Sequence, residues 1–278
     1  MKSFDGKVAA ITGAGSGIGR ELALELARQN CHLALSDVNE QGLAETVTMV
    51  RPLGVRVTRT KVDVADRAAV HAWADATARE HGKVNLIFNN AGVALGCTLE
   101  GVSYEDFEWI MNINFWGVVH GTKAFLPHLR ASGEGHIVNI SSLFGIVAVA
   151  GNGAYNATKF AVRGFTEALR QELELGNAKV SATSVHPGGI KTNIARSSRL
   201  SDDLKAFTTV SEEESRERMD KMFMTSANSA ARTILKAVRR NRRRVLVGPD
   251  AHAIDLVARI MPQGYQQLTK AMARRLAQ

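Results

Sequence analysis

The sequence predicts a single doubly wound α/β domain with a largely parallel sheet. Short apolar runs of strand length alternate with helical patterns from the N-terminus to about residue 250. A glycine-rich turn follows the first of these runs. Strands and helices that alternate in this way form a parallel sheet with right-handed crossovers and helices on both faces. A chain of 278 residues is within the size range of one such domain.

The composition is that of an ordinary globular protein. Hydrophobic residues make up 45% and charged residues 22% of the chain, which allows a substantial core. The two cysteines, Cys31 and Cys97, form no disulfide framework and show no metal-ligand spacing, so we expect a reducing compartment and no metal site. We also recognise no signal peptide and no apolar run as long as a membrane span. The sequence therefore predicts a cytoplasmic protein that does not bind membranes.

The formal net charge of +8 raises the question of an anionic partner such as nucleic acid. The excess is concentrated late, at residues 239–240 and 242–244 and between residues 259 and 275. No aromatic residues alternate with these arginines, as a base-stacking surface requires. A solvated helix end or a subunit contact explains the cluster better than a nucleic-acid site.

The first strand is expected at residues 7–12, followed by the glycine turn 13–19 and a helical pattern through Ala27. Strand, glycine turn and helix in this order are the context that a dinucleotide-binding loop requires. Glycines let the backbone approach a pyrophosphate closely, and the helix N-terminus offers free N–H groups. The predicted cofactor contacts here are Gly13, Ser16, Gly17, Ile18 and Gly19.

The second strand, residues 32–36, ends at Asp37. An acidic residue at about this distance from the glycine turn accepts hydrogen bonds from the adenosine ribose hydroxyls. Its carboxylate would repel a 2′-phosphate, and neither Ser16 nor Val38 offers a compensating positive charge. NAD is therefore favoured over NADP, unless Asp37 is only a surface turn residue.

Two more polar segments follow predicted strands. Asp63 and Val64 come after the strand 55–62 and are assigned to the adenine, although Asp63 could instead be the N-cap of the next helix. The strand 84–88 leads into a segment at its carboxyl end, where open α/β sheets bind ligands. The cofactor residues expected in that segment are Asn90, Ala91 and Gly92.

Tyr155 and Lys159 lie one turn apart on the same face of a helix predicted at residues 153–175. An ammonium roughly 4 Å from the phenol, at an effective dielectric of about 20, favours the phenolate by about 4 kcal/mol, or about three pK units. Such a shift would suit Tyr155 to acid–base work near neutral pH. Ser142 precedes this helix and is placed to bond the same substrate oxygen. Taken alone, the pair also fits an exposed amphipathic helix face.

Further elements are expected as helices at 40–51, up to 81, 104–129 and 227–240, strands at 136–140, 179–185 and 245–247, and a C-terminal helical tail from about residue 250. Asn114 falls within a long helix, where it is either satisfied core structure or a functional group. Segment 186–192 turns at Pro187 and Gly188 beside the cofactor's nicotinamide, where Thr192 could bond the carboxamide. Residues 190–225 carry methionines and phenylalanines and are interpreted either as a substrate lid or as an amphipathic helix packed on the body: Phe207, Met219, Met222, Phe223 and Met224.

In this order and spacing, the motifs resemble the short-chain dehydrogenase/reductase family over about residues 5–250. They are Thr12-Gly13-x-x-x-Gly17-x-Gly19, Asp63, Asn89-Asn90-Ala91-Gly92, Asn114, Ser142, Tyr155-x-x-x-Lys159, Pro187-Gly188 and Thr192. The resemblance implies a Rossmann fold and cofactor contacts that also include Tyr155, Lys159, Pro187, Gly188 and Ile190. It also implies a homodimer or homotetramer that pairs through the helices containing Asn114 and Tyr155.

The catalytic roles come from the same resemblance. Tyr155 is the acid–base residue, Ser142 steadies the substrate oxygen, and Lys159 bonds the nicotinamide ribose and favours the tyrosinate. Asn114 holds a water that links Lys159 to solvent. Hydride transfer develops charge on the oxygen that Tyr155 and Ser142 address, so placement and chemistry agree.

The expected reaction interconverts a secondary alcohol, apolar or aromatic, and a ketone. Substrate contacts are assigned to Ser142, Leu143, Phe144, Val149, Tyr155 and Gly189. Apolar residues of the tail could cover this pocket or a neighbouring subunit: Ile254, Leu256, Val257, Ile260, Tyr265 and Leu268. Two alternatives are a non-catalytic dinucleotide sensor or scaffold and a binder of anionic surfaces; the complete set of catalytic residues argues against the sensor.

Overall fold

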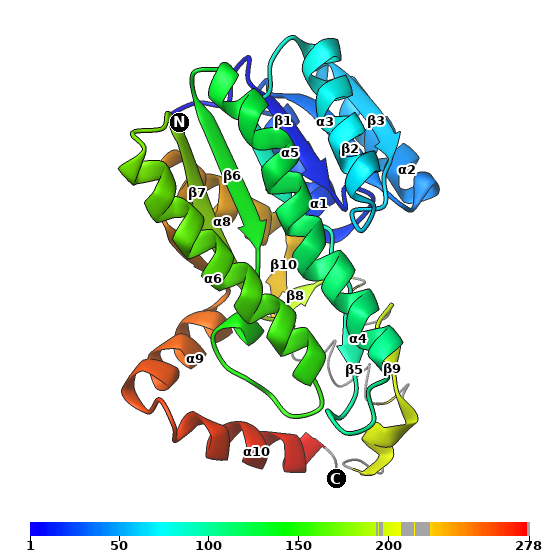
Figure 1. Ribbon diagram of the computed structural model, residues 1–278, viewed down its shortest axis with the longest axis vertical. Helices are drawn as coiled ribbons and strands as arrows, with labels where there is room; N and C mark the ends of the chain where they lie inside the picture. Colours follow the sequence, from blue (N-terminus) through cyan, green and yellow to red (C-terminus); the bar gives the residue numbers. More distant parts are fainter. Residues whose placement is uncertain (193, 195–196, 207–213, 215–222, 277–278) are drawn as a thin grey trace.

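A parallel sheet runs through the centre of the molecule. The computed structural model describes residues 1–192, 194, 197–206, 214 and 223–276. Within these residues, seven parallel strands form one sheet (Figure 1). In spatial order they are β11 (Arg244–Val247), β7 (Val180–Pro187), β6 (Gly135–Ile140), β4 (Leu86–Asn89), β1 (Val8–Thr12), β2 (His32–Asp37) and β3 (Val57–Lys61).

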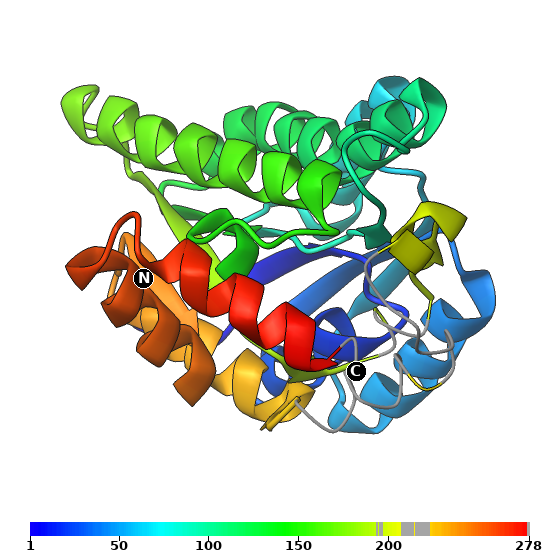
Figure 2. The ribbon, with the colours of Figure 1, turned by 90° about the horizontal axis from the view of Figure 1, so that it is seen from below.

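Helices cover both faces of this sheet. One face carries α1 (Gly17–Ala27), α2 (Glu40–Val50) and α8 (Ala227–Arg239), and the other carries α3 (Arg67–His81), α5 (Gly117–Ala131) and α6 (Gly153–Leu175) (Figure 2). From the centre the chain winds outward through β1, β2 and β3 in one direction and through β4, β6, β7 and β11 in the other. This arrangement confirms the predicted doubly wound α/β fold.

Each face of the sheet has its own hydrophobic core. Leu22 and Leu26 of α1 and Ile234 of α8 are fully buried against one face. On the other face, the rings of Trp73 in α3 and Phe125 in α5 meet edge to face with centroids 4.9 Å apart. Because both faces are covered, strands such as β1 and β4 are buried along their whole length and are almost continuously apolar.

The long helix expected at residues 104–129 is interrupted by one π-helical segment. The chain forms α4 (Tyr104–Met111), the π-helical segment Asn112–Trp116 and then α5. Asn114 lies in this segment and is fully buried. Such bulges inside helices are frequent at functional sites.

Four two-residue strands at the carboxyl edge of the sheet were not expected from the sequence. They form two parallel pairs, β5 (Leu95–Gly96) with β9 (Arg199–Leu200) and β8 (Ile190–Lys191) with β10 (Thr225–Ser226). Part of the expected lid therefore has regular structure. Its residues Phe207, Met219 and Met222 lie outside the described residues.

The C-terminal helices α9 (Pro249–Ile260) and α10 (Tyr265–Leu276) lie at the end of the molecule that also carries these short strands (Figures 1 and 2). Ala251 packs with Leu143 and Val147 in a separate apolar cluster. The Tyr265 hydroxyl accepts a hydrogen bond of 3.3 Å from the Ala148 amide. Among the described helices, none combines the length and apolarity needed to cross a membrane.

His136 of β6 is buried at the opposite end of the sheet. Its Nε2 lies 2.8 Å from the Thr183 hydroxyl, and that hydroxyl donates to the Arg242 carbonyl, so the ring is the donor in the first bond. Burial first, and then the positive charges of the N-terminus and Arg170, lower the pKa of His136 to about 3. The ring is therefore neutral in the folded protein at pH 7.

We predict that His136 makes the fold sensitive to acid. Between pH 6.5 and 3 an unfolded histidine binds a proton that folded His136 does not, so the free energy of unfolding falls as the pH falls. At pH 4.5 the loss attributable to this residue is about 3 kcal/mol. Thermal melts should show that His136→Asn is less stable than wild type at pH 7 but loses less stability between pH 7 and 4.5. An identical pH dependence in the two proteins would contradict this account.

Candidate active site

The glycine turn after β1 is locked to the end of β4. The Thr12 hydroxyl accepts hydrogen bonds from the amides of Asn90 (2.9 Å) and Ala91 (3.0 Å), and Asn90 Nδ2 donates to the Gly13 carbonyl (3.1 Å). Gly13 has φ +64°, and a Cβ there would lie 2.8 Å from the Ala91 Cα. Glycine is required because the two loops approach so closely. The structure thus brings Gly13 together with Asn90 and Ala91.

The N-terminus of α1 suits an anionic ligand. Ser16 occupies the N-cap position, but its side chain makes no capping hydrogen bond. Gly17 has φ +51°, and a Cβ at Gly19 would lie 2.1 Å from the Gly13 carbonyl oxygen, so the backbone is tightly turned. Free amides and the helix dipole together favour a phosphate group at this position. Ile18 packs against the core beneath the turn.

Asp37 closes the far side of this turn. Its Oδ2 accepts a hydrogen bond of 2.8 Å from the Gly15 amide, and its Oδ1 accepts one of 2.9 Å from Asn39. Arg20, which sequence reasoning missed, donates to the Gly15 carbonyl and is paired with Glu45 at 2.8 Å. Asp37 is therefore part of the turn's own structure rather than an isolated surface residue.

Asp63 and Val64 follow β3 at the same edge. Asp66, not Asp63, is the N-cap of α3, and it accepts a 3.0 Å hydrogen bond from Ala69. The N-cap interpretation of Asp63 is therefore wrong; its exposed carboxylate accepts from the Ala65 amide. Val64 is buried, and its carbonyl lies 3.1 Å from the His120 ring.

Ser142, Tyr155 and Lys159 converge where β6 meets the first turns of α6. The Ser142 side chain lies beside the Tyr155 hydroxyl and lowers the pKa of that phenol. Lys159 Nζ lies 5.5 Å from the centroid of the Tyr155 ring and donates to the Ile140 carbonyl at 3.2 Å. The Phe144 ring meets the Tyr155 ring edge to face, with centroids 6.0 Å apart.

Burial dominates the acid–base properties of this group. It lowers the pKa of Lys159 to about 8 and raises the pKa of Tyr155 above its ordinary value, while the hydrogen bond from Ser142 partly offsets the rise for Tyr155. The predicted lowering of the Tyr155 pKa by the neighbouring ammonium is therefore wrong for the protein alone. Removing the phenolate from water destabilises it by more than the charge of Lys159 stabilises it at this distance.

Asn114 ties the β4 loop to α6. Its Oδ1 accepts from the Val93 amide at 2.8 Å, and its Nδ2 donates to the Val93 carbonyl at 2.9 Å and to the Thr158 hydroxyl at 3.3 Å. A Cβ on Gly92 would lie 3.1 Å from Asn114 Oδ1 and 3.4 Å from Lys159 Nζ. Gly92, Asn114 and Lys159 therefore share one small volume.

The segment after β7 lies at the same carboxyl edge of the sheet. Pro187 and Gly188 stand at the carboxyl end of β7, and Ile190 begins β8 with its side chain buried. A Cβ on Gly189 would lie 2.6 Å from the Phe223 ring, and one on Gly17 would lie 3.1 Å from Thr192 Cγ2. Loop 187–192 thus runs from Phe223 to the glycine turn.

Two polar contacts in this region escaped sequence reasoning. Asp250 of α9 accepts a 2.6 Å hydrogen bond from the Gly189 amide, and His186 lies 2.9 Å from the Ser142 carbonyl. Both join segments that are far apart in the chain. An acidic residue after β11 and a histidine before Pro187 were the available signals.

Three of the predicted substrate contacts, Leu143, Phe144 and Val149, lie in one apolar cluster. Leu143 is buried in the cluster with α9, whereas Phe144 and Val149 are half-buried around it. Ile254 and Tyr265 of the tail pack on the same cluster. The tail residues Leu256, Ile260 and Leu268 are exposed.

The segment that contains β9 is held by contacts to α4 and to the loop after β5. Arg199 pairs with Asp106 at 2.8 Å, and its guanidinium stacks 3.6 Å from the centroid of the Trp109 ring. Asp203 accepts hydrogen bonds from both the amide and the hydroxyl of Thr98. Residues 199–203 are therefore fastened to α4 and the loop before it.

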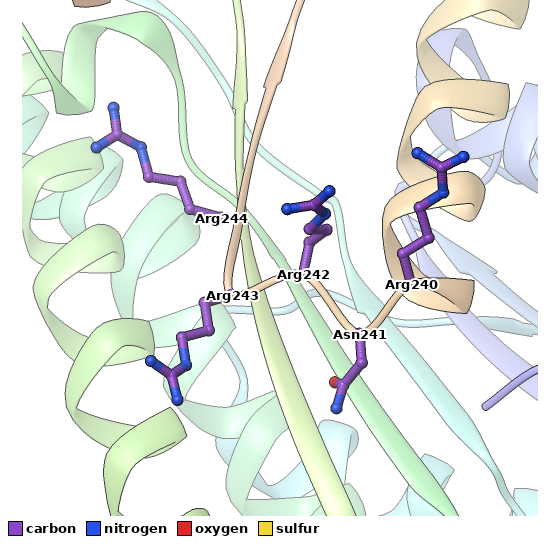
Figure 3. A pocket seen from close by; sticks show the side chains of 5 residues that line it. All are labelled: Arg240, Asn241, Arg242, Arg243 and Arg244. Atoms are coloured by element: carbon purple, nitrogen blue, oxygen red, sulfur yellow. The ribbon is translucent and has the colours of Figure 1, made fainter.

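The late arginine cluster lies away from this site. Residues 240–244 line a surface hollow of about 640 Å³ at the amino end of β11, and their side chains fan out from the loop (Figure 3). Arg243 is paired with Glu174 at 2.9 Å, and Arg244 is paired with Asp255. This loop joins α8 to the edge strand β11. It therefore lies at the amino end of the sheet, whereas Ser142 lies at the carboxyl end.

A glycine turn after the first strand, with adjacent serine and tyrosine side chains and a lysine at the same edge, defines a class of oxidoreductases. The family model described as short chain dehydrogenase matches residues 7–203. The chain belongs to the short-chain dehydrogenase/reductase family and is an oxidoreductase.

Three comparisons show the closeness of the relationship. The putative oxidoreductase SadH of Mycobacterium tuberculosis is 51% identical over 273 residues, which cover 98% of this chain and 96% of SadH. Retinol dehydrogenase 10 of Xenopus tropicalis is 35% identical over 232 residues, which cover 74% of this chain and 68% of that protein. The crystal structure of a short-chain dehydrogenase/reductase from Burkholderia phymatum in complex with NAD has a TM-score of 0.85 and 34% identity, and covers 96% of this chain and 97% of its own.

Proposed function

We propose that this protein is an NAD(H)-dependent oxidoreductase that interconverts a secondary alcohol and a ketone. The observation that carries the proposal is the placement of Ser142 beside the Tyr155 hydroxyl, with Lys159 Nζ 5.5 Å from the centroid of the Tyr155 ring, at the edge that also holds the glycine turn. A non-catalytic sensor would need the turn but not this group. The sensor is the second candidate, and retention of all four of Asn114, Ser142, Tyr155 and Lys159 disfavours it.

In this proposal the protein transfers a proton to and from the substrate oxygen. NAD(H), when bound, carries the hydride. Tyr155 donates its phenolic proton to the oxygen of a ketone and takes one back from an alcohol, while the Ser142 hydroxyl steadies the same oxygen. Burial raises the pKa of Tyr155, which keeps the proton available for donation. Lys159 would hold the nicotinamide ribose, and Asn114 would support a water next to Lys159.

The glycine turn supports a dinucleotide cofactor. The uncapped N-terminus of α1 would take the pyrophosphate, and the Asp37 carboxylate would accept from the adenosine ribose. Asp63, Val64 and the loop after β4 would border the adenine and the ribose, and loop 187–192 would border the nicotinamide. Arg20 is engaged by Glu45 and the turn, so it does not offset the charge of Asp37. NAD is therefore the preferred cofactor, in line with the NAD bound to the Burkholderia relative.

The surroundings of Tyr155 favour an apolar substrate. Phe144 meets the Tyr155 ring and Phe223 lies against Gly189, while Val149 packs in the apolar cluster that joins Phe144 to α9 and α10. We assign residues 190–225 to a substrate lid and residues 250–278 to an extension of the same single domain. The relative named retinol dehydrogenase 10 is consistent with a bulky apolar alcohol.

We also propose a homo-oligomer that pairs through the helices carrying Asn114 and Tyr155. Trp116 and Phe160 on these helices are 47% and 39% exposed, which is unusual for large aromatic side chains.

We also propose that the protein is located in the cytoplasm. The two cysteines of the chain are free and buried, so neither forms a disulfide.

Tyr155→Phe should abolish turnover while leaving NAD binding intact. The substitution removes the proton donor and keeps the ring, so kcat should fall by roughly 10²- to 10⁴-fold. Steady-state rates with a panel of secondary alcohols and ketones, and NADH titration by fluorescence, measure the two effects. Tyr104→Phe, at an exposed tyrosine, is the matched control and should behave like wild type. Appreciable turnover by Tyr155→Phe would refute the assigned proton role.

Asp37→Asn should weaken the preference for NAD over NADP. The amide keeps an acceptor for the Gly15 amide but removes the charge that opposes a 2′-phosphate, so the ratio of kcat/KM values should move toward NADP by about tenfold or more. Parallel assays with both cofactors measure this ratio, and Asp63→Asn serves as a control for loss of charge nearby. An unchanged ratio would show that another residue selects the cofactor.

A further inference from the structure

His186 is buried at the end of β7, and both ring nitrogens are hydrogen-bonded. Nδ1 lies 2.9 Å from the Ser142 carbonyl oxygen, and Nε2 lies 3.0 Å from the Ser184 hydroxyl. A carbonyl can only accept, so Nδ1 carries the proton and Nε2 accepts from Ser184. The partners therefore select one neutral tautomer.

Burial, together with two nearby arginines, maintains this neutral form of the His186 ring. Burial is the main cause that lowers the pKa of His186 to about 4, and Arg244 and Arg163 act in the same direction. The bond to the Ser142 carbonyl and the Asp255 carboxylate act in the opposite direction but are outweighed. The donor at Nδ1 is thus unchanged across the pH range of ordinary enzyme assays.

The carbonyl that His186 holds belongs to Ser142, in a segment outside the sheet. β6 ends at Ile140 and a 3₁₀ turn begins at Leu143, so Ser142 stands between them in an extended conformation (φ −162°, ψ 168°). Its carbonyl also accepts a 3.0 Å bond from the Gly145 amide within this turn. Of these two contacts, only the one from His186 ties Ser142 to another strand.

The strand that carries His186 is firmly held in the sheet. β7 lies between β6 and β11, with His186 opposite Leu246. Directly afterwards, the Gly188 amide donates to the Val247 carbonyl at 2.9 Å, and the Gly189 amide donates to Asp250. The imidazole therefore projects from a fixed point beside loop 187–192.

We propose that His186 is a positioning residue that sets the Ser142 hydroxyl against Tyr155 by holding the Ser142 carbonyl to the end of β7. The inference rests on the proposed role of Ser142. The Ser142 side chain accepts from the Phe144 amide at 3.1 Å and lies beside the Tyr155 hydroxyl, so a displaced Ser142 peptide would disturb both contacts. His186 thus aligns the proposed substrate-oxygen site with the proposed nicotinamide site.

The first test compares His186→Leu with His186→Asn. The two side chains have similar shapes, but the Asn amide places a donor near the Nδ1 position. His186→Leu should lower kcat by about tenfold or more, because small misplacements of a reacting group slow catalysis strongly. His186→Asn should recover most of this loss, and KM and NADH affinity should change little in both. His136→Leu, at the other buried histidine, should lose stability without losing kcat.

A double variant separates positioning from a general structural role. If His186 acts through the Ser142 hydroxyl, His186→Leu should lower kcat by less than about twofold on the background of Ser142→Ala. An equal loss on both backgrounds, or full kcat in His186→Leu, would overturn the inference while leaving the proposed function intact.

A readout without turnover keeps the inference testable if the proposed function fails. The Leu143 amide shares its peptide group with the Ser142 carbonyl, so its ¹⁵N resonance should move in His186→Leu and return in His186→Asn. A resonance unaffected by either change would overturn the inference. In wild type, ring ¹⁵N shifts should show a neutral His186 with the proton on Nδ1 from pH 8 to 5; a cationic ring or a proton on Nε2 would contradict it, even if His186→Leu does not fold.

Discussion

The parallel alignment of β1, β4, β6 and β7 determines where chemistry can occur in this molecule. Because these strands end at the same edge, the loops after them meet there, although they are far apart in sequence. Two side-chain ties then set neighbouring loops against each other. Thr12 accepts from the amides after β4, and His186 reaches from β7 to the carbonyl of Ser142 after β6. The glycine turn and the Ser–Tyr–Lys group owe their common location to this framework.

Burial that stabilises the sheet also sets the charge states of the ionisable groups beside it. The pKa values of Lys159, His136 and His186 are lowered and that of Tyr155 is raised, and desolvation is the largest cause in each case. Each shift favours the neutral form. Both histidines therefore act as neutral, directional hydrogen-bonding groups. Tyr155 keeps its proton for the substrate oxygen that we propose it serves.

The fold could be predicted from sequence because periodicity and glycine placement are local signals. Apolar runs marked the strands of the sheet, and the spacing of Tyr155 and Lys159 placed both on one helix face. The two-residue strands carry no periodic signal, and the π-helical segment at Asn114 depends on contacts with Val93 and Thr158. These features could not be predicted from local patterns.

The site could be predicted in part for the same reason. Residues in recognisable motifs were assigned, whereas Arg20, His186 and Asp250 were missed because their contacts depend on the folded chain. The direction of the Tyr155 pKa was wrong because burial of the phenol cannot be read from the four-residue spacing. Asp63 was open to two interpretations until Asp66 proved to be the N-cap of α3.

Transfer of deuterium from NADH labelled at C4 to a ketone tests the central claim most directly. Wild-type protein, both stereoisomers of the labelled cofactor and a series of ketones of increasing apolar bulk would be used, with mass spectrometry of the product alcohol. The proposed function predicts one deuterium on the carbinol carbon from one of the two stereoisomers, with rates that rise with apolar bulk. NADH binding without labelled alcohol from any ketone in the series would contradict it and favour a dinucleotide sensor.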